Sequence, residues 1–316
     1  MHRPKKAVSS GKKTAAAGAG PTAPKWPSFK GHSQFVGTSP SGRATVYVDP
    51  KLGQPALQNA QDLVNDADRV VAANDAIFAT TGGPVSVIVF ALGGMTDGTG
   101  GADHMGCDYT TGAAIECCAS FGNSARVSAL FEAELSECSM GGNLCGVSTG
   151  EALSRWCATV ISHNALADFA TAPQWASDGM PNYVDKTDAT DQNADSTGCG
   201  MAFISWLMSQ GHGLEKITPA MVALGDAGTL AQVYAGVTSD AASNAWPNFH
   251  RAVQGLKGGV TNDDPFGGAA QVSAIAGNKP SHAVAAVRVP SARVAGAAAA
   301  CTPKSHRLQP PTKAKA

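Results

Sequence analysis

The stretch from Ser124 to Val184 decides the fold that we predict for this chain. Its first part, Leu130-Phe-Glu-Ala-Glu-Leu-Ser-Glu-Cys138, has apolar residues at helical spacing, and Gly122-Asn-Ser124 before it is typical of a helix start. The spacing predicts a second helix from Ser148 to about Phe169. The segment Trp175-Ala-Ser-Asp-Gly-Met-Pro-Asn-Tyr-Val184 then predicts a turn with a short helical piece. Two consecutive helices therefore form the centre of the expected domain.

The regions on either side give the fold class. Before the two helices, residues 44–48 and 85–92 are predicted strands, joined by a helix that Pro55 begins. After Val184 the apolar spacing is helical up to about Val253. We expect an α+β fold in which a small N-terminal sheet packs on helices and the C-terminal part is helical. Residues 43–257 form the predicted single domain, between a disordered basic arm (1–42) and a disordered low-complexity tail (258–316).

Composition limits the possible partners. Hydrophobic residues make up 43% of the 316 residues, and the formal net charge is -1. A chain with this balance has no global attraction for nucleic acid or an anionic membrane, and aromatics at 6% are too few for a base-stacking surface. No apolar run reaches the roughly 18 residues of a membrane helix. We expect no nucleic-acid partner and no transmembrane segment.

The eight cysteines favour disulfide bonds and an oxidising compartment, because seven of them cluster in the central region. The Gly-containing loop from Cys138 to Cys145 and the pair Cys157–Cys199 are the preferred bridges. The alternative is a set of buried free thiols in a cytosolic protein. The basic N-terminus lacks the apolar core of a signal peptide, which conflicts with export. The predicted location is secreted or cell envelope, with cytoplasmic as the alternative.

The order of elements and motifs resembles the zincin-like basic secretory protein family of peptidases over about residues 44–255. The motifs are Trp175-x-x-Asp178-Gly179-x-x-x-Tyr183-Val184, Phe203-Ile204-x-Trp206-Leu207, Thr229-Leu230-x-x-Val233-Tyr234 and Ala245-Trp246-Pro247-x-Phe249. In that family a His-Glu-x-x-His helix holds zinc, because positions i and i+4 share one helix face and the Glu activates a water. The resemblance implies the family's fold.

This chain departs from the family at the metal ligands. Phe131 and Leu135 stand at the two histidine positions, and neither side chain can ligate zinc. Glu132 remains at the general-base position, and Asp178 at that of the downstream acid. We therefore expect no metal or cofactor, and a pseudoenzyme that binds a protein or a small ligand in the former cleft. The alternative is a hydrolase, either a peptidase with non-standard active-site residues or a carboxylate-dependent enzyme that uses Glu132, Glu134 and Asp178.

Other residues carry weaker signals. His163, on the second predicted helix, could pair with an acid or a cysteine thiolate. Glu134 and Glu137 share one helix face; they could act as acid and base, or simply form a solvated surface. Ser148 lies in a Gly-x-Ser-x-Gly sequence, but a loop precedes it where a nucleophile elbow needs a strand, so it is predicted to be a helix cap. His104 is predicted to be a turn residue in the glycine-rich loop at 93–106.

Overall fold

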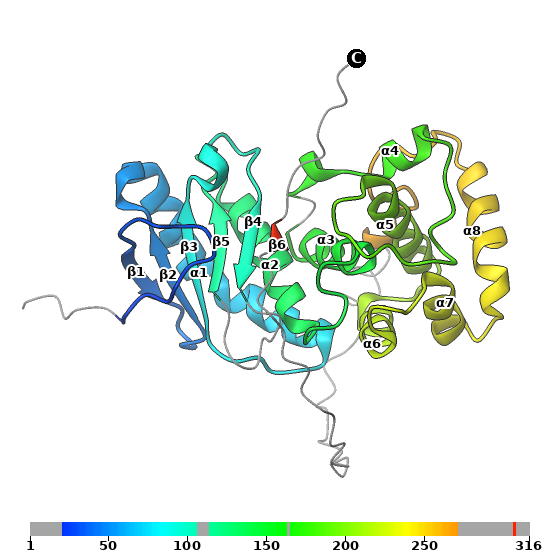
Figure 1. Ribbon diagram of the computed structural model, residues 1–316, viewed down its shortest axis with the longest axis horizontal. Coiled ribbons are helices and arrows are strands. Elements are labelled where there is room, and N and C mark those ends of the chain that lie inside the picture. The colour runs from blue at the N-terminus through cyan, green and yellow to red at the C-terminus, as the bar shows by residue number, and fades with distance from the viewer. Residues whose placement is uncertain (1–20, 106–113, 163–164, 271–305, 308–316) are drawn as a thin grey trace, which may run out of the picture.

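The computed structural model describes residues 21–105, 114–162, 165–270 and 306–307. It has two halves, which lie side by side in Figure 1. One half is a mixed sheet with two helices on it, and the other consists of helices. The expected α+β class, with the sheet in the N-terminal part and helices in the C-terminal part, is confirmed.

The sheet has the strand order β1-β2-β3-β5-β4-β6. The strands are β1 (Gln34–Thr38), β2 (Ala44–Val48), β3 (Val85–Phe90), β4 (Ala102–Met105), β5 (Ala114–Cys118) and β6 (His306–Arg307). β2, β3 and β5 run parallel, whereas β1 and β4 run antiparallel to their neighbours. The predicted strands at 44–48 and 85–92 correspond to β2 and β3, and β3 ends at Phe90, two residues early. β3 and β5 are apolar at nearly every position, as strands covered on both faces are.

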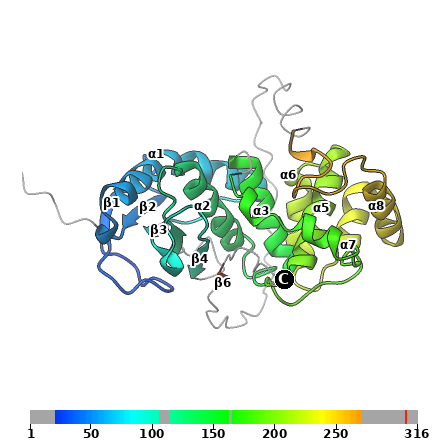
Figure 2. The same cartoon turned by 90° about the horizontal axis from the view of Figure 1, so that it is seen from above.

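Two helices, α1 (Gly53–Phe78) and α2 (Ser124–Ser139), lie together along the sheet (Figure 2). The amide of Arg126 donates to the Asn123 side chain at 3.1 Å, which caps α2 at the predicted place. Nearly every residue of α2 is buried, including its acids, because the sheet covers one side and the next helix, α3 (Ser148–Ser162), covers another. The expectation that the α2 acids form a solvated surface is wrong.

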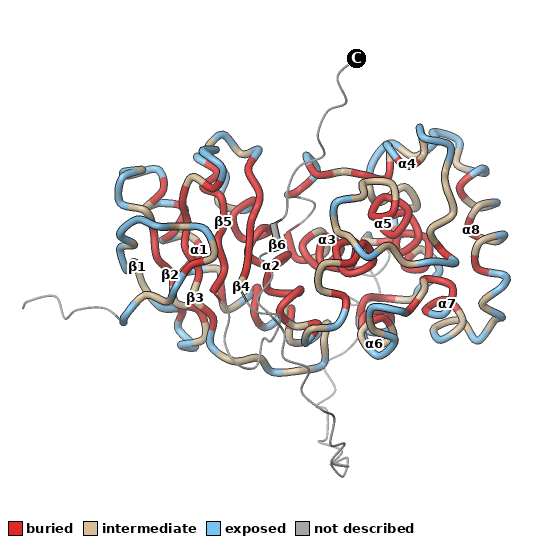
Figure 3. Tube along the Cα trace, in the orientation of Figure 1, coloured by how far each residue is buried: buried red, intermediate tan, exposed pale blue. Residues whose placement is uncertain are grey.

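The helical half is built around α5 (Ala194–Ser209), whose fully buried centre is visible in Figure 3. The other helices here are α4 (Ala172–Ser177), α6 (Leu214–Leu224), α7 (Leu230–Thr238) and α8 (Ala245–Gln254). Trp175 stacks on Phe249 with centroids 5.7 Å apart, and Phe203 meets Phe249 edge-on at 5.1 Å. These aromatic contacts join α4, α5 and α8 into one core.

The predicted limits of the domain are too narrow at both ends. β1 and the buried Trp26 lie inside the segment predicted to be a disordered arm. The buried carboxylate of Glu116 fixes this segment by accepting from the amides of Ser28 (3.0 Å) and Phe29 (2.7 Å). At the other end, the Asp263 side chain accepts from the amide of Thr171 at 2.8 Å, within the predicted tail. Residues 1–20 and 271–305 lie outside the described part.

The preferred disulfide bridges are wrong. Cys138, Cys157 and Cys199 are buried free thiols, as are Cys117 and Cys118, so neither Cys138–Cys145 nor Cys157–Cys199 forms. The expectation of an oxidising compartment came from the number and clustering of all eight cysteines, so the location of the protein stays a prediction. Among the described helices, none combines the length and the apolar content that crossing a bilayer requires.

Candidate functional site

The sequence places the lost zinc site at Phe131 and Leu135, and both side chains lie in the apolar core between α2 and the sheet, with no exposed surface. A metal there would be surrounded by hydrocarbon with no ligand from either residue. These positions therefore do not fit a metal.

The other sequence-predicted site residues lie in separate surroundings. Glu132 is fully buried, its charged neighbours are Arg69 and Asp75, and neither carboxylate oxygen has a described hydrogen-bond partner. Asp178 lies at the C-terminal end of α4. Burial raises the pKa of Asp195, and the nearby charge of Asp178 raises it further. None of the described contacts joins Glu132 to Asp178. His163 lies outside the described residues, and the catalytic roles of all three stay predictions.

A different set of side chains meets at the other side of α2. This acid cluster consists of Glu134 and Glu137 from α2, Glu151 from α3 and His104 from β4. All four are buried; Glu134 is 1% exposed and His104 0%. Glu137 Oε2 lies 3.2 Å from His104 Nε2. The i,i+3 spacing of the two α2 acids directs both toward β4 and α3, so three elements supply the cluster.

Burial raises the pKa of Glu134 well above its usual range, and the nearby carboxylate of Glu137 raises it further. Burial also raises the pKa of Glu137, and the adjacent carboxylate of Glu151, which is hydrogen-bonded to it, adds to the effect. The pKa values of Glu134 and Glu137 rise because two like charges are unfavourable at short range in a buried site. Both oxygens of Glu134 lack a hydrogen-bond partner among the described atoms. The cluster is therefore short of positive charge and of donors.

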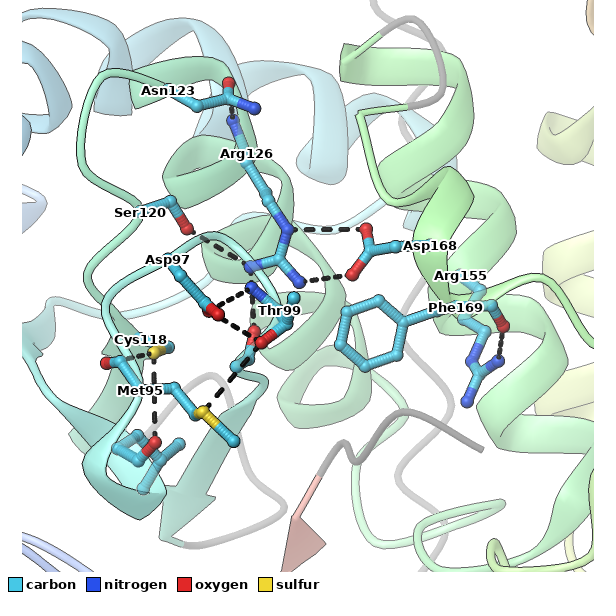
Figure 4. A network of polar contacts seen from close by, with 12 residues as sticks. Met95, Asp97, Thr99, Cys118, Ser120, Asn123, Arg126, Arg155, Asp168 and Phe169 are labelled. Atoms are coloured by element: carbon cyan, nitrogen blue, oxygen red, sulfur yellow. Dashed lines mark hydrogen bonds and ion pairs between the residues drawn. The ribbon is translucent and has the colours of Figure 1, made fainter. Parts of the chain in front are cut away.

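Arginines hold the outer side of the cluster in place. Arg155 donates through Nε to Glu151 Oε1 at 2.6 Å and through Nη1 to the Phe169 carbonyl at 2.6 Å. Phe169 also receives the guanidinium of Arg126 over its ring, 5.2 Å from the centroid. Figure 4 shows this arrangement, in which Phe169 lies between the two arginines.

Arg126 then ties α2 to the glycine-rich loop. Its Nη2 donates to Asp168 Oδ2 at 2.7 Å, and its Nη1 donates to the Gly100 carbonyl at 2.7 Å and to Ser120 Oγ at 3.1 Å (Figure 4). This buried guanidinium thus fixes the loop that leads into β4. Because β4 carries His104, the network sets the position of the imidazole as well as that of Glu151.

Two cysteines border the imidazole of His104. Cys138 Sγ lies 3.3 Å from Nδ1, and Cys145 Sγ lies 3.9 Å from Nε2. One ligand atom each from His104, Glu137 and Cys145 would lie within 4.8 Å of one another, a size that could hold a metal ion. Cys145 already takes part in another interaction, so we do not count it as a free ligand.

A separate open cavity of about 690 Å³ lies between the segment from Pro21 to Phe35 and Tyr47. No residue of the acid cluster lines it. It therefore offers no entry to the cluster.

The chain was compared with known proteins at three levels. No protein-family model matches it. No curated protein sequence and no solved structure matches it either. The geometry must carry the functional argument alone.

Sequence reasoning noted the shared face of Glu134 and Glu137 but missed His104 and Glu151 as their partners. His104 was expected in a turn, because glycines and aspartates surround it in the sequence. The structure places it in the four-residue strand β4 and buries it. Glu151 lies in the first turn of the second predicted helix, and it was not singled out from the sequence. The Arg155 four residues later was a usable sign, since i,i+4 pairs of this kind lie on one helix face.

Proposed function

We propose that this protein binds an extended polypeptide along β4, and that the acid cluster recognises a basic side chain of that polypeptide. The proposal keeps the expected role of a zincin-like domain that binds a partner without a zinc site, and moves the site from Glu132 to the other side of α2. The observation that carries it is Glu134, a buried acid with both oxygens unpartnered. A lysine or arginine would supply the missing charge and donors.

The location of the cluster supports a strand-like ligand. β4 pairs with β5 through one edge, and among the described residues its other edge pairs with the two-residue strand β6 alone. An extended peptide can add to such an edge through main-chain hydrogen bonds, with side-chain contacts giving specificity. His104 belongs to β4 and contacts Glu137, so a peptide on this edge would lie beside the acids.

Peptide binding to the full chain tests the proposal. A fluorescently labelled ten-residue peptide that alternates Lys or Arg with Val or Thr is titrated by anisotropy, beside a copy with Glu in place of the basic residues. We expect the basic peptide to bind at least about tenfold tighter, a difference of roughly 1.4 kcal/mol. Methylation of alternate backbone amides should abolish binding, because it removes the ladder donors. Equal affinity for both peptides would refute the proposal.

Two isosteric variants of α2 localise the effect. Glu134→Gln removes the unpartnered acid and should lower the affinity for the basic peptide about fivefold to tenfold. Glu132→Gln is a matched control on the same helix and should leave this affinity unchanged.

A basic ligand also draws protons off the acids, so affinity should rise with pH as Glu134 and Glu137 ionise. The titratable and charged groups that face them are His104, Asp103, Glu151 and Asp191, with Arg155 paired to Glu151. If the affinity for the basic peptide fell as the pH rises, the proposed contact between a basic side chain and Glu134 would be contradicted.

A second candidate function, hydrolysis of a peptide bond, is favoured by the closeness of the Glu137 and Glu151 carboxyl groups, which raises the pKa of Glu137. In that reaction the Glu151 carboxylate takes a proton from a water molecule, and the oxygen of that water adds to the carbonyl carbon of the peptide bond. Glu137 gives its proton to the leaving nitrogen as the C–N bond breaks, so an acid and an amine form. Mass spectrometry of incubated peptides tests it. Cleavage that Glu137→Gln abolishes would support this role, and intact peptide would exclude it for those substrates.

A further inference from the structure

The cavity between the segment from Pro21 to Phe35 and Tyr47 has a size that suits a small ligand. Its volume of about 690 Å³ lies within the roughly 300–1,000 Å³ that small-molecule sites occupy. In Figure 2 the segment is the dark blue loop beside β1. Because no residue of the acid cluster lines the cavity, a ligand here would be independent of peptide binding at β4.

Contacts at three places hold this segment in one shape. Tyr47 Oη donates to the carbonyl of Pro21 at 3.1 Å. Trp26 Nε1 donates to Ser33 Oγ at 3.4 Å, across the segment. Between these two ties, the buried carboxylate of Glu116 accepts from two main-chain amides of the segment. The walls of the cavity are therefore formed before a ligand arrives, which lowers the ordering cost of binding.

Aromatic rings supply the apolar part of the lining. Trp26 and Tyr47 meet edge to face with centroids 5.4 Å apart, and both side chains are buried. The ring of Phe35 lies 6.0 Å from that of Tyr47 and is 37% exposed. This group of rings offers a flat or aliphatic ligand both ring faces and ring edges.

Among the described residues that line the cavity, every side chain that carries charge is basic. Lys25 and Lys30 lie at exposed positions, His32 adds a charge when protonated, and no aspartate or glutamate is present. An ammonium group binds a carboxylate through charge-assisted hydrogen bonds. Residues 1–20, which precede the segment, include basic residues but no acid and no aromatic residue. They match neither part of the lining, whereas an anion from solution matches both.

We propose that this cavity binds a small organic anion that has an aromatic or aliphatic body and a carboxylate group. The body packs on Trp26, Phe35 and Tyr47, and the carboxylate pairs with the lysines. The inference goes beyond the proposed function and does not depend on it. It requires both parts of the ligand, because the rings do not select the sign of a charge and the lysines do not select an apolar body.

Three probe compounds separate these two parts. The full chain is titrated calorimetrically with 2-naphthoate, with 2-naphthylmethylamine, which has the same rings and the opposite charge, and with acetate, which lacks the rings. We expect naphthoate to bind at least about tenfold tighter than either of the others. It should also slow hydrogen exchange at the amides of residues 22–35. Equal affinity for naphthoate and the amine, or no binding of naphthoate, would overturn the proposal.

Variants with matched controls place the ligand in the cavity. Lys25→Gln/Lys30→Gln should lower the affinity for naphthoate at least about fivefold, whereas Lys257→Gln changes an exposed lysine outside the lining and should have no effect.

Phe35→Ala should lower this affinity by a similar factor. Its control is Phe121→Ala, because Phe121 is 39% exposed and does not line the cavity. Unchanged affinity in both cavity variants would overturn the assignment of the site, and the peptide titrations would still decide the proposed function separately.

Discussion

At the scale of single residues, α2 carries two buried acids in different situations, Glu132 and Glu134. Glu134 belongs to the acid cluster, while Glu132 lies on the side that faces α1, near Arg69 and Asp75. Burial raises the pKa of Glu132 well above its usual range, and the attraction of Arg69 offsets this in part. A buried acid outside the cluster lowers stability and has no evident role in binding.

The variant Glu132→Gln should therefore stabilise the protein at neutral pH. Because the pKa is raised in the folded state, the unfolded chain loses its proton first as pH rises, and wild-type stability falls above the unfolded pKa. Below that pKa both states are protonated and the penalty is absent. We expect the variant to gain about 1–3 kcal/mol at pH 7 and nothing near pH 4. Urea unfolding of both proteins across this range measures the difference, and a gain independent of pH would contradict the explanation.

At the scale of elements, small residues allow the helices of the C-terminal half to approach closely. A Cβ on Gly198 in α5 would collide with the Thr171 carbonyl and lie 2.9 Å from Trp175 Cβ, and one on Gly200 would lie 2.7 Å from Ala152 Cβ. The contacts of α5 with α4 and α3 thus depend on glycine. The close contact at Gly200 holds α3, which carries Glu151, against α5.

The variant Gly198→Ala should destabilise the fold by about 1–3 kcal/mol, because main-chain atoms must move to admit the methyl group. Gly236→Ala is the matched control: this glycine lies exposed in α7, and an added Cβ meets nothing within 4 Å. Alanine there should stabilise by roughly 0.5–1 kcal/mol through helix propensity. The denaturant midpoints of both variants measure these changes in stability. Similar shifts in both would show that the close packing at Gly198 does not contribute to the free energy of unfolding.

At the scale of the whole molecule, the two halves have separate hydrophobic cores that meet along α1, α2 and α3. The sheet, α1, α2 and the C-terminal end of α3 contribute to one core, and the rest of α3 with α4–α8 forms the other. α2 packs against α3, and α1 also contacts α3 and α6. The acid cluster spans this boundary, since His104 and Glu137 come from the first half and Glu151 from the second.

Such shared packing should make the two halves unfold as one unit. Native-state hydrogen exchange should give the same opening free energy, within about 1 kcal/mol, for the slowest amides of β3 and of α5. The exposed strand β1 should open at a lower free energy, which provides the internal comparison. A gap above about 2 kcal/mol between β3 and α5 would show that the halves are independent units.

The sequence by itself determined the elements whose signals are local. Apolar spacing and capping residues predicted α2, the start of α3 and the strands at 44–48 and 85–92, the second of which ends at Phe90, and these together indicated the α+β class. Signals of this kind depend on neighbours within a few positions along the chain. That neither Phe131 nor Leu135 can ligate zinc was readable for the same reason.

Tertiary structure alone decided which side of α2 carries the candidate site. His104, Glu137 and Glu151 lie far apart in the sequence, and only the position of β4 at the sheet edge and of α3 across α2 brings them together. The buried Trp26 segment and the free thiols were decided in the same way. Helical periodicity predicts which residues lie on the same face of a helix. Which element covers that face depends on contacts between distant parts of the chain.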